Sequence, residues 1–543
     1  MYAGKNKCCP AHGGCMENSE NRYDVIFIGS GIGSLTAASL LAQFRKSRVL
    51  ILERHFQAGG FTHEFKRKQN KYSWDVGIHY IGDLQEGSLT RKVFDTITKG
   101  NLKWNRMAEP FERFVYPEGT FAVYGDPERY KSDLISQFPE EKDAIEKYFK
   151  DVKKMAGYFG KHMLLKLMPP AIESLASLFD PSEPIMTVKD YMDRHFKDYR
   201  LKAILASQWG DYGLPPSIAS FAIHALVVYH YLNGGYFPDG GSGKILECIE
   251  PIVEENGGKI LTSHEVTEVL IENGKAVGVK VKHLRGREEN PYENFYAPNV
   301  VSCAGAVPTY MKLIPQSYPI AFRDDLQKFY KSNPRVSHVS MYLGLSKDPR
   351  ELGFNGENYW IYSNYDHDRN FAERNSWPEK PIAGAYLSFP SLKNPSAKSH
   401  TAEIIAFTDY ENFEKWKDSP WKKRGEEYEA FKTKIKESLL DYINGKFPGF
   451  KDIVEFSELS TPVTNEHFTG HPMGMIYGLP CVPDRFNSAK CPWFSLQTPV
   501  ENLYLTGADA SSPGVSGAMM GGLNVAIKLM DGFDFVKMLL RGK

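Results

Sequence analysis

The clearest pattern of apolar and polar positions lies near the start of the chain, in residues 23–60. A short apolar run from Val25 to Ile28 is typical of a buried strand. Glycines follow it, and then small and apolar residues from Leu35 to Phe44 with helical spacing. A second apolar run, Val49 to Leu52, ends on an acidic residue. The pattern therefore predicts a strand, a helix and a second strand in succession.

Glycines occupy the turn between the first strand and the helix. Gly29, Gly31 and Gly33 allow a tight turn that brings a pyrophosphate to the amides at the helix N-terminus. Glu53 follows about 20 residues later, where a carboxylate can accept hydrogen bonds from ribose hydroxyls. Ser34 stands where this fingerprint has Gly or Ala, and it is small enough for close packing. The unit predicts dinucleotide binding, against the alternative of an ordinary strand-to-helix turn.

The chain continues past the same site after the second strand. Gly59 and Gly60 follow Glu53 and Arg54, and glycine lets the backbone pass close to a cofactor. We assign these four residues to the cofactor site. The segment from Asp75 to Gly82 predicts a strand that returns toward the site.

In residues 84–230 strand patterns no longer alternate with helix patterns, and the sequence predicts a mainly helical region. Apolar positions recur with helical spacing from Pro139 to Tyr158 and from Val188 to Trp209. The stretch from Met155 to Phe179 is largely apolar and is interrupted by Pro169 and Pro170. It predicts either a segment that dips into a membrane surface or a pair of helices that closes a lipid-sized pocket.

Possible site residues are concentrated between Ile204 and Lys244. Asp211 and Tyr212 precede two histidines, His224 and His230, in an apolar and aromatic run. We interpret these histidines as hydrogen-bonded core residues, because no third ligand is spaced to complete a metal site with them. No metal site is predicted.

Strand and helix patterns alternate again after Lys244, and strands predominate later. A solvated helix is expected within the charged run 422–446. The predicted helix and strands are Ile245–Asn256, Lys259–Thr262, Val266–Glu272, Ala276–Val281, Asn299–Cys303, Ser337–Leu345, Tyr359–Tyr362 and Ala402–Phe407.

A second glycine-rich helix start lies near the C-terminus. A predicted strand from Asn502 to Thr506 leads into Gly507 and Asp509, and an apolar helix then runs to Met530. Backbone amides at such a start can face a second anion. A cofactor long enough to reach both helix starts indicates FAD rather than NAD.

Composition narrows the class of protein. The 543 residues are 42% hydrophobic and 24% charged, and 66 basic residues balance 66 acidic ones, so no nucleic-acid partner is indicated. Seven cysteines, an odd number, favour a reducing compartment over a disulfide framework. Without a signal-peptide core or a membrane-length apolar run, we expect an intracellular protein, cytoplasmic or peripherally membrane-associated. Residues 1–22, with Cys8, Cys9, His12 and Cys15, are expected to form a flexible tail.

Several segments between about Tyr23 and Met530 together resemble the FAD-containing phytoene desaturase superfamily, and within it the retinol saturase and carotenoid isomerase branch. They are the fingerprint with Glu53, Asp75–Gly82, Trp209–Gly213, His224 to Leu226, His230 and Tyr231, Gly235–Gly241, Val300 to Cys303 with Ala304 and Gly305, and Asn502–Asp509. The segments around His79 and Pro238 are the most specific to this branch.

The resemblance implies an α/β fold with a discontinuous Rossmann-type (βαβ) FAD-binding domain and an inserted substrate domain of helices plus a sheet. The expected FAD-binding segments are 23–95, 235–310 and 496–543, and the substrate segments are 96–234 (helical) and 311–495. It also implies that Val266 places a backbone contact on adenine and that Gly517, Ala518 and Met519 face the flavin ring.

The implied activity is that of an FAD-dependent oxidoreductase on double bonds of a long apolar polyene or isoprenoid lipid, by saturation, desaturation or cis–trans isomerisation. His79, Asp211 and Tyr212 are the candidates for a proton donor or an orienting group. Two alternatives remain: a flavin-dependent amine or fatty-acid oxidase or isomerase of the same fold, and a non-catalytic flavin-bound lipid-binding protein. Electrons could come from NADPH, a quinone or another protein, and the oligomeric state is not predicted.

Overall fold

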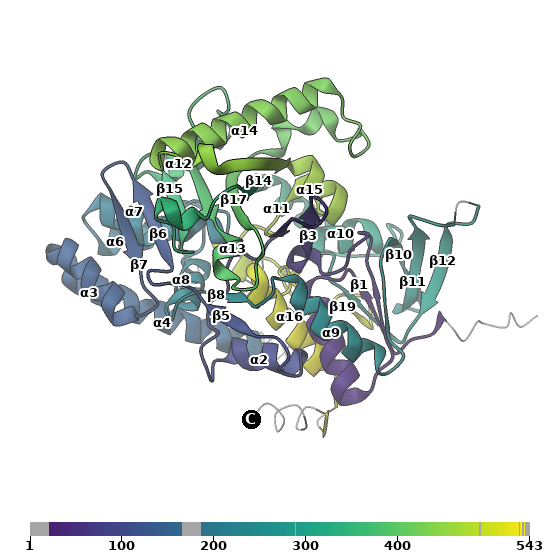
Figure 1. Ribbon diagram of the computed structural model, residues 1–543. Helices are drawn as coiled ribbons and strands as arrows, with labels where there is room; N and C mark the ends of the chain where they lie inside the picture. The colour runs from purple at the N-terminus through teal and green to yellow at the C-terminus, as the bar shows by residue number, and fades with distance from the viewer. Residues whose placement is uncertain are drawn as a thin grey trace, which may run out of the picture.

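A five-stranded parallel sheet joins segments from the beginning, middle and end of the chain (Figure 1). The computed structural model describes residues 21–165, 186–287, 289–487 and 490–531, with Phe533, Asp534 and Lys537. The strand order is β19 (Leu503–Leu505), β13 (Asn299–Ser302), β1 (Val25–Ile28), β2 (Val49–Leu52) and β9 (Lys259–Leu261). Val25 pairs with Val49 on one side and Asn299 on the other. Strands of this kind are apolar throughout because both faces of the sheet are covered.

Three helices pack around this sheet. They are α1 (Ile32–Leu40), continued by a π-helical turn at Leu41–Arg45, α9 (Gly243–Glu254) and α16 (Gly514–Leu529). Helix α1 packs against both α16 and α9. The adjoining antiparallel sheet contains β10 (His264–Glu272), β11 (Lys275–His283) and β12 (Tyr292–Tyr296), with a tight turn at Asn273 and Gly274.

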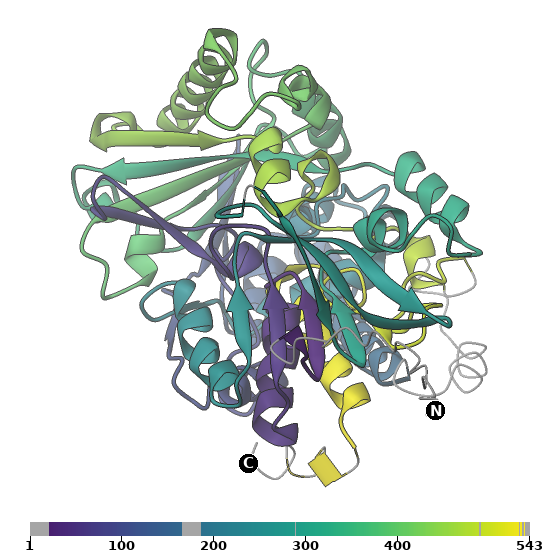
Figure 2. The ribbon, with the colours of Figure 1, turned by 90° about the vertical axis from the view of Figure 1, so that its right-hand side faces the viewer.

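A seven-stranded sheet forms the second layer of the molecule (Figure 2). Its strands, in spatial order, are β18 (Val454–Ser460), β14 (Ser337–Leu345), β17 (His400–Thr408), β16 (Gly384–Ser388), β15 (Asn358–Tyr362), β6 (Glu112–Tyr116) and β7 (Gly119–Val123). Strand β6 runs parallel to β15, and the other neighbours are antiparallel. Helix α14 (Glu426–Lys446) contributes Ile435, Leu439 and Ile443 to the core on this sheet.

Helices from the first half of the chain surround the space next to this sheet. They are α2 (Leu89–Ile97), α3 (Pro127–Gln137), α4 (Lys142–Leu165), α6 (Val188–His195), α7 (Tyr199–Ala206) and α8 (Phe221–Tyr231), with a 3₁₀ helix at Ser207–Asp211. Two antiparallel strand pairs complete this part, the hairpin of β3 (Glu64–Arg67) with β4 (Tyr72–Asp75) and the long-range pair of β5 (Trp104–Arg106) with β8 (Tyr236–Pro238). The remaining short helices are α10 (Ala306–Pro308), α11 (Arg323–Ser332), α12 (His367–Ala372), α13 (Pro390–Lys393) and α15 (Pro462–Thr469).

One prediction about secondary structure is wrong. The strand expected from Asp75 to Gly82 ends at Asp75, and only Ile81 forms a further bridge, to Tyr236. After Asp75 the chain passes close to Phe61, and a Cβ added to Gly77 would lie 3.0 Å from the Phe61 carbonyl oxygen. The region 84–230 is mainly helical, as predicted, and it also contains β5, β6 and β7. Strand β6 pairs with residues far along the chain, which local periodicity does not reveal.

Two further predictions fall largely on residues outside the described ranges. The predicted tail lies almost entirely there, and so does most of the stretch from Met155 to Phe179. Within the described ranges, the helices are all too short or too polar to span a bilayer.

Candidate active site

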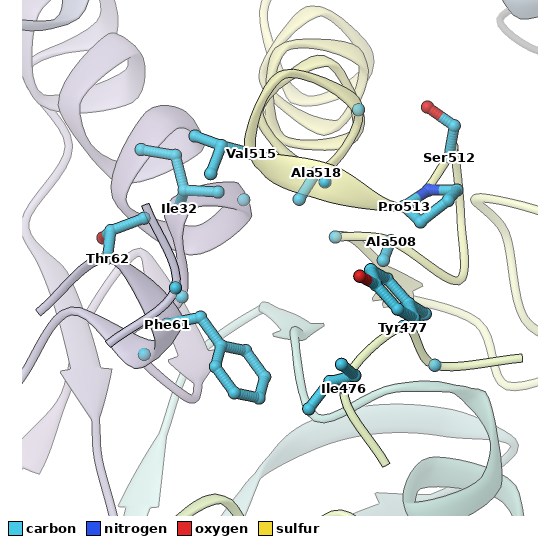
Figure 3. Close-up of a pocket in the computed structure, with 18 of the residues that line it drawn as sticks. Ile32, Phe61, Thr62, Ile476, Tyr477, Ala508, Ser512, Pro513, Val515 and Ala518 are labelled. Carbon is cyan, nitrogen blue, oxygen red and sulfur yellow. The ribbon is translucent and has the colours of Figure 1, made fainter. Parts of the chain in front are cut away.

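A cavity of about 800 Å³ lies between the parallel sheet and the seven-stranded sheet. Small-molecule sites have volumes of ~300–1,000 Å³. Figure 3 shows one end, where Ile32 of α1 and Val515 of α16 face each other and Phe61 and Tyr477 lie below them. The cavity continues to residues of the large sheet such as Trp360 and Ile405. It therefore connects the nucleotide-binding sheet with an aromatic and apolar chamber.

The two glycine-rich helix starts lie against each other at one side of this cavity. A Cβ added to Gly33 would lie 2.8 Å from the Gly507 nitrogen and 2.9 Å from Thr506 Oγ1. A Cβ added to Gly522 would lie 2.2 Å from the Gly33 oxygen. Only hydrogen fits at these positions, so the absence of side chains permits the packing of α1 on α16. Gly33 and Gly507 both line the cavity.

Glu53 is held at the end of β2 with 7% of its surface exposed. Its Oε2 accepts hydrogen bonds from the Ser30 nitrogen (2.9 Å) and Oγ (2.6 Å), and its Oε1 accepts one from the His55 nitrogen (2.8 Å). Ser30 Oγ in turn accepts from the Gly59 nitrogen at 2.8 Å. These bonds tie the acid to both glycine turns. Glu53 also lines the cavity, and Oε1 keeps a lone pair for another donor.

The site fits an extended, negatively charged dinucleotide. Neither Gly31, at the N-terminus of α1, nor Pro513, at that of α16, provides a side-chain cap, and neither first turn contains an acidic residue. The exposed amides of each helix can therefore face an anion. Thr506 Oγ1 and Ser516 Oγ are buried and have no hydrogen-bond partner among the described residues, although both residues line the cavity.

Most of the residues expected to bind the cofactor line this cavity. They are Gly29, Gly31, Gly33, Glu53, Arg54, Gly60, Val266, Ala304, Gly305, Gly507, Asp509, Gly517 and Ala518. Three others lie behind the lining. Ser34 is buried within α1, and Gly59 donates to Ser30. Met519 is fully buried, whereas the next residue, Met520, reaches the cavity.

Asp509 connects three segments that surround the cavity. Its Oδ1 accepts a hydrogen bond from the Leu479 nitrogen at 2.7 Å, and its Oδ2 accepts one from the Ala306 nitrogen at 2.8 Å. The carboxylate thus ties the loop after β13 and the 476–479 loop to the start of the C-terminal segment.

Asp211 belongs to a chain of three polar groups next to the cavity. Tyr80 Oη lies 2.7 Å from Glu112 Oε1 and 3.0 Å from Asp211 Oδ2. Burial raises the pKa of Glu112 to about 7, and burial together with the nearby Glu112 raises that of Asp211 well above its usual range. Tyr80 and Asp211 line the cavity.

A second ionisable cluster contains His79. Its Nδ1 lies 2.8 Å from Glu403 Oε2 but off the hydrogen-bonding direction, so neither atom has a hydrogen-bond partner among the described residues. Lys393 Nζ donates to the His79 carbonyl (2.8 Å), Asn358 Oδ1 (2.5 Å) and Ser388 Oγ (2.6 Å).

Burial dominates the electrostatics of this second cluster. It lowers the pKa of His79 to about 3 and that of Lys393 to about 7, because the charged forms lose their hydration. It raises the pKa of Glu403 to about 8 and that of Asp75 to about 7. At neutral pH His79 is therefore an uncharged imidazole, able to orient a group by hydrogen bonding.

The structure separates Tyr212 from the other two candidate catalytic residues. Tyr212 is buried and does not line the cavity, and its hydroxyl lies 3.1 Å from His224 Nδ1. The other nitrogen of His224 lies 2.8 Å from the Tyr148 hydroxyl. His230 Nε2 accepts from the Gly82 nitrogen at 2.8 Å. Both histidines thus have partners within the protein.

Sequence analysis missed several polar residues at the site. They are Tyr80, Glu112, His338, Lys393 and Glu403. A glutamate at the head of the apolar run ERFVY was a usable signal for Glu112, because a charged residue in a buried strand needs partners. Lys393 and Glu403 carry no comparable local signal.

Comparisons with known proteins agree with this geometry. A family model described as an NAD(P)-binding Rossmann-like domain matches residues 28–97. All-trans-retinol 13,14-reductase of Danio rerio is 34% identical over 527 residues, which cover 92% of this chain and 84% of that protein. Chloroplastic prolycopene isomerase of Arabidopsis thaliana is 25% identical over 480 residues, 86% of this chain and 76% of that protein.

The fold also matches solved structures. Cyclohexylamine oxidase from Brevibacterium oxydans superposes with a TM-score of 0.58 and 14% identity, covering 96% of this chain and 100% of that one. At this identity the likeness concerns the fold alone. The α/β fold class with a Rossmann-type domain and an inserted second domain is confirmed.

Proposed function

We propose a function from the premise that this chain belongs to the FAD-dependent oxidoreductase family that contains the all-trans-retinol 13,14-reductases and the prolycopene isomerases. The protein is an FAD-dependent oxidoreductase that acts on double bonds of a polyene. The reaction that we assign is saturation of one carbon–carbon double bond in a retinoid-like polyene. The higher identity to the reductase than to the isomerase supports this assignment.

The continuity of the cavity is the structural observation that carries the proposal. One end is formed by the two uncapped helix starts, and the other by aromatic and aliphatic side chains. Trp209, Trp360, Tyr386, Ile405 and Phe407 belong to this second end. A polyene is long, flat and apolar, so such a chamber can bind it and exclude water.

The residues around the helix starts would hold the cofactor. Glu53 is placed for ribose hydroxyls, and Gly31 and Gly33 for the pyrophosphate. The start of α16 would place its positive end toward the flavin ring, where negative charge forms on reduction. When bound, FAD would supply the hydride chemistry that a carbon–carbon double bond requires.

The polar residues at the cavity have different roles in this proposal. His79, neutral because of burial, would orient the substrate by hydrogen bonding. Asp211 carries a raised pKa and faces the cavity, so it is the candidate proton donor. Tyr212 would support the 3₁₀ helix that ends at Asp211, through its hydroxyl contact with His224.

Cis–trans isomerisation is the second candidate reaction, and the prolycopene isomerase relative favours it. The same apolar chamber would serve, but the reaction would consume no reducing equivalents.

An anaerobic assay, in which purified protein is mixed with candidate polyenes, separates these reactions. We expect the protein to carry flavin, and all-trans-retinol to oxidise the reduced flavin while the polyene loses one double bond. Mass spectrometry of the product would show a gain of two hydrogen atoms. Isomerised product of unchanged mass, formed while the flavin stays reduced, would assign the second reaction. Polyenes recovered unchanged with the flavin still reduced would contradict both. An amine that reduces the oxidised flavin, and is itself oxidised to the imine, would favour the amine oxidase alternative.

NADPH is the electron donor that we propose to test first. The sequence contains one complete dinucleotide fingerprint, which FAD would occupy, so the donor would act from another site or through a partner protein. Stopped-flow mixing of the oxidised protein with NADPH measures this directly. Rapid bleaching of the flavin absorbance is the expected result, and an unchanged spectrum would point to a quinone or a protein donor.

Peripheral membrane contact through Met155 to Phe179 is a further proposal. Its first residues already belong to the cavity, since Ala156, Phe159 and Gly160 line it. A lipid substrate could then enter from the bilayer near this helix. Acidic substitutions in the apolar part should reduce flotation with phospholipid vesicles, while equal substitutions on the exposed face of α14 should not. Unchanged flotation of the first variant would contradict the proposal.

A further inference from the structure

The chain of Asp211, Tyr80 and Glu112 contains more hydrogen-bond acceptors than protons if both acids are ionised. Tyr80 Oη lies within hydrogen-bond distance of both carboxyl groups, at 2.7 Å from Glu112 and 3.0 Å from Asp211. A phenol has a single proton, so it can donate to only one of them. The other contact is a hydrogen bond only if that carboxyl group carries a proton and donates to the tyrosine oxygen.

The remaining partners decide which carboxyl group is charged. Glu112 Oε1 also accepts from Trp360 Nε1 at 2.8 Å, and Glu112 Oε2 accepts from Gln208 Nε2 at 2.7 Å. An indole nitrogen can only donate, so Glu112 acts as an acceptor there. Donors to both oxygens stabilise the carboxylate form.

Asp211 has the opposite environment. Among the described residues, Tyr80 provides its one side-chain hydrogen bond. With the Tyr80 proton directed to Glu112, Asp211 must donate from Oδ2 to the tyrosine oxygen. The negative charge of Glu112 close by further disfavours ionisation of Asp211, as its raised pKa reflects.

The fold places the protonated group toward the substrate and the charged group behind it. Asp211 ends the 3₁₀ helix and lines the cavity, whereas Glu112 begins β6, is fully buried and is not part of the lining. Tyr80 stands between them and stacks on Tyr231, with ring centroids 4.2 Å apart. The ring contact fixes the position of the hydroxyl.

We propose that Asp211 holds the proton that is delivered to the polyene, and that Tyr80 and Glu112 are positioning residues that keep Asp211 protonated and hydrogen-bonded. This inference rests on the proposed saturation. In that reaction the π bond breaks, one carbon gains a hydride equivalent from the reduced flavin, and the other gains the proton. The O–H bond of Asp211 breaks, leaving a carboxylate to which the Tyr80 hydroxyl can turn. A proton from water restores the acid.

Infrared difference spectra of the resting, oxidised protein, recorded above the pKa of about 7 of Glu112, test the location of the proton without turnover. Subtracting the spectrum of Asp211→Asn from that of the wild type should reveal the C=O band of a protonated carboxylic acid. Subtracting that of Glu112→Gln should reveal the two bands of a carboxylate. The reverse result, with the acid band belonging to Glu112, would overturn the proposal. Carboxylate bands in both differences would also overturn it.

Two further variants separate positioning from general structural effects. Tyr80→Phe should move the acid band of Asp211 to higher frequency, because the carboxyl group no longer donates a hydrogen bond. Glu357→Gln is the matched control, since Glu357 is equally buried but forms an ion pair with Arg113 at 3.1 Å. This control should leave the acid band unchanged. An acid band that Tyr80→Phe does not shift would exclude the hydrogen bond on which the proposal depends.

Single-turnover rates then connect the proton to the reaction. Asp211→Asn should slow oxidation of the reduced protein by the polyene by about 10²–10⁴-fold, the usual contribution of a general acid, and Asp211→Glu should restore part of the rate. A normal rate in Asp211→Asn would overturn the catalytic role even if the infrared result holds. If no polyene oxidises the wild-type flavin, the proposed function fails, and the infrared spectra still report where the proton lies.

Discussion

At the scale of single residues, Gly33 shows how close the two ends of the chain come. Its missing side chain leaves just enough room for the backbone at Gly507, and an added Cβ would lie 2.8 Å from that nitrogen. Both residues are part of the cavity wall. Packing at this point therefore determines whether the two helix starts can face one ligand.

We predict that Gly33→Ala weakens flavin retention and destabilises the protein. Overpacking of a rigid contact costs about 1–3 kcal/mol, and here the methyl group meets backbone atoms that cannot rotate away. Flavin content after gel filtration and urea unfolding would measure both effects. Gly445→Ala in α14 is the control, because a Cβ there meets nothing within 4 Å. Equal flavin content in both variants would contradict the prediction.

Glu403 gives a prediction about pH. Burial raises its pKa from the ordinary glutamate value of 4.5 to about 8, so the folded protein keeps this proton at pH values where the unfolded chain has lost it. The free energy of unfolding therefore falls as pH rises through this window. Glu403→Gln removes this titration, so its stability relative to the wild type should increase from pH 5 to 7, by up to about 1.4 kcal/mol per pH unit.

Denaturant unfolding of both proteins at several pH values would test this. The groups around Glu403 are His79, Lys393, Asp75 and Tyr342. Lys393 has a pKa of about 7, and above that pH its titration makes the free energy of unfolding rise with pH, opposite to the effect of Glu403. The comparison therefore stays below pH 7. A stability difference that is constant with pH would show that Glu403 is ionised in the folded protein.

Individual residues were predictable where a backbone motif specified them. Gly31, Gly33 and Glu53 belong to a local pattern whose spacing reflects the shape of a dinucleotide, and the structure places all three at the cavity. Glu112 and Lys393 could not be assigned in this way. Their environments arise from residues far away in the chain, so the raised and lowered pKa values depend on burial that only the folded protein provides.

At the scale of elements, the 3₁₀ helix at Ser207–Asp211 lies against strand β15. A Cβ added to Gly210 would lie 2.2 Å from Cζ3 of Trp360. This close approach brings Gln208 and Trp360 to the same glutamate, Glu112. The helix therefore positions Asp211 through its contact with the sheet.

Gly210→Ala should displace this helix. We expect a loss of about 1–3 kcal/mol in the free energy of unfolding and a changed infrared band for Asp211, because Asp211 and Trp360 can no longer keep their places together. Gly157→Ala in α4, where a Cβ has open space, serves as the control. A Gly210→Ala protein with wild-type stability and spectrum would show that the helix does not position the acid.

The strands of the parallel sheet were predicted almost to the residue. Val25–Ile28 and Val49–Leu52 match β1 and β2, and Ser337–Leu345 matches β14 of the large sheet, because continuous or dense apolar runs are typical of strands buried on both faces. Strands β6 and β7 escaped detection. They are short and polar in places, and β6 gains its burial from β15, which follows over 200 residues later. The partner, not the local pattern, determines their structure.

At the scale of the whole molecule, one apolar core extends from the parallel sheet to the large sheet, and a second core packs the large sheet against α14. The larger buried cluster contains Ile26 and Leu50 of the parallel sheet together with Trp360 and Tyr386 of the large sheet. Lys393 adds a polar connection, since it donates to the carbonyl of His79. The part of the protein around the parallel sheet and the part around the large sheet therefore stabilise each other.

We expect these parts to unfold together. In urea, the increase in fluorescence of released flavin should coincide with the change in tryptophan fluorescence, because one buried cluster contains residues of both sheets. Trp209 and Trp360 report on the substrate side of the cavity. Two separated transitions, with flavin lost at a lower urea concentration, would contradict this prediction.

The position of β19 and α16 has a consequence for how the protein is made. These last elements supply the edge strand of the parallel sheet and one wall of the cavity. They are synthesised after the other strands and helices that surround the cavity. A nascent chain that has not yet reached β19 therefore lacks Gly517, Ala518 and the other α16 residues of the cavity wall. We expect it to retain no flavin at that stage, and a stop codon placed before β19 should give a colourless polypeptide.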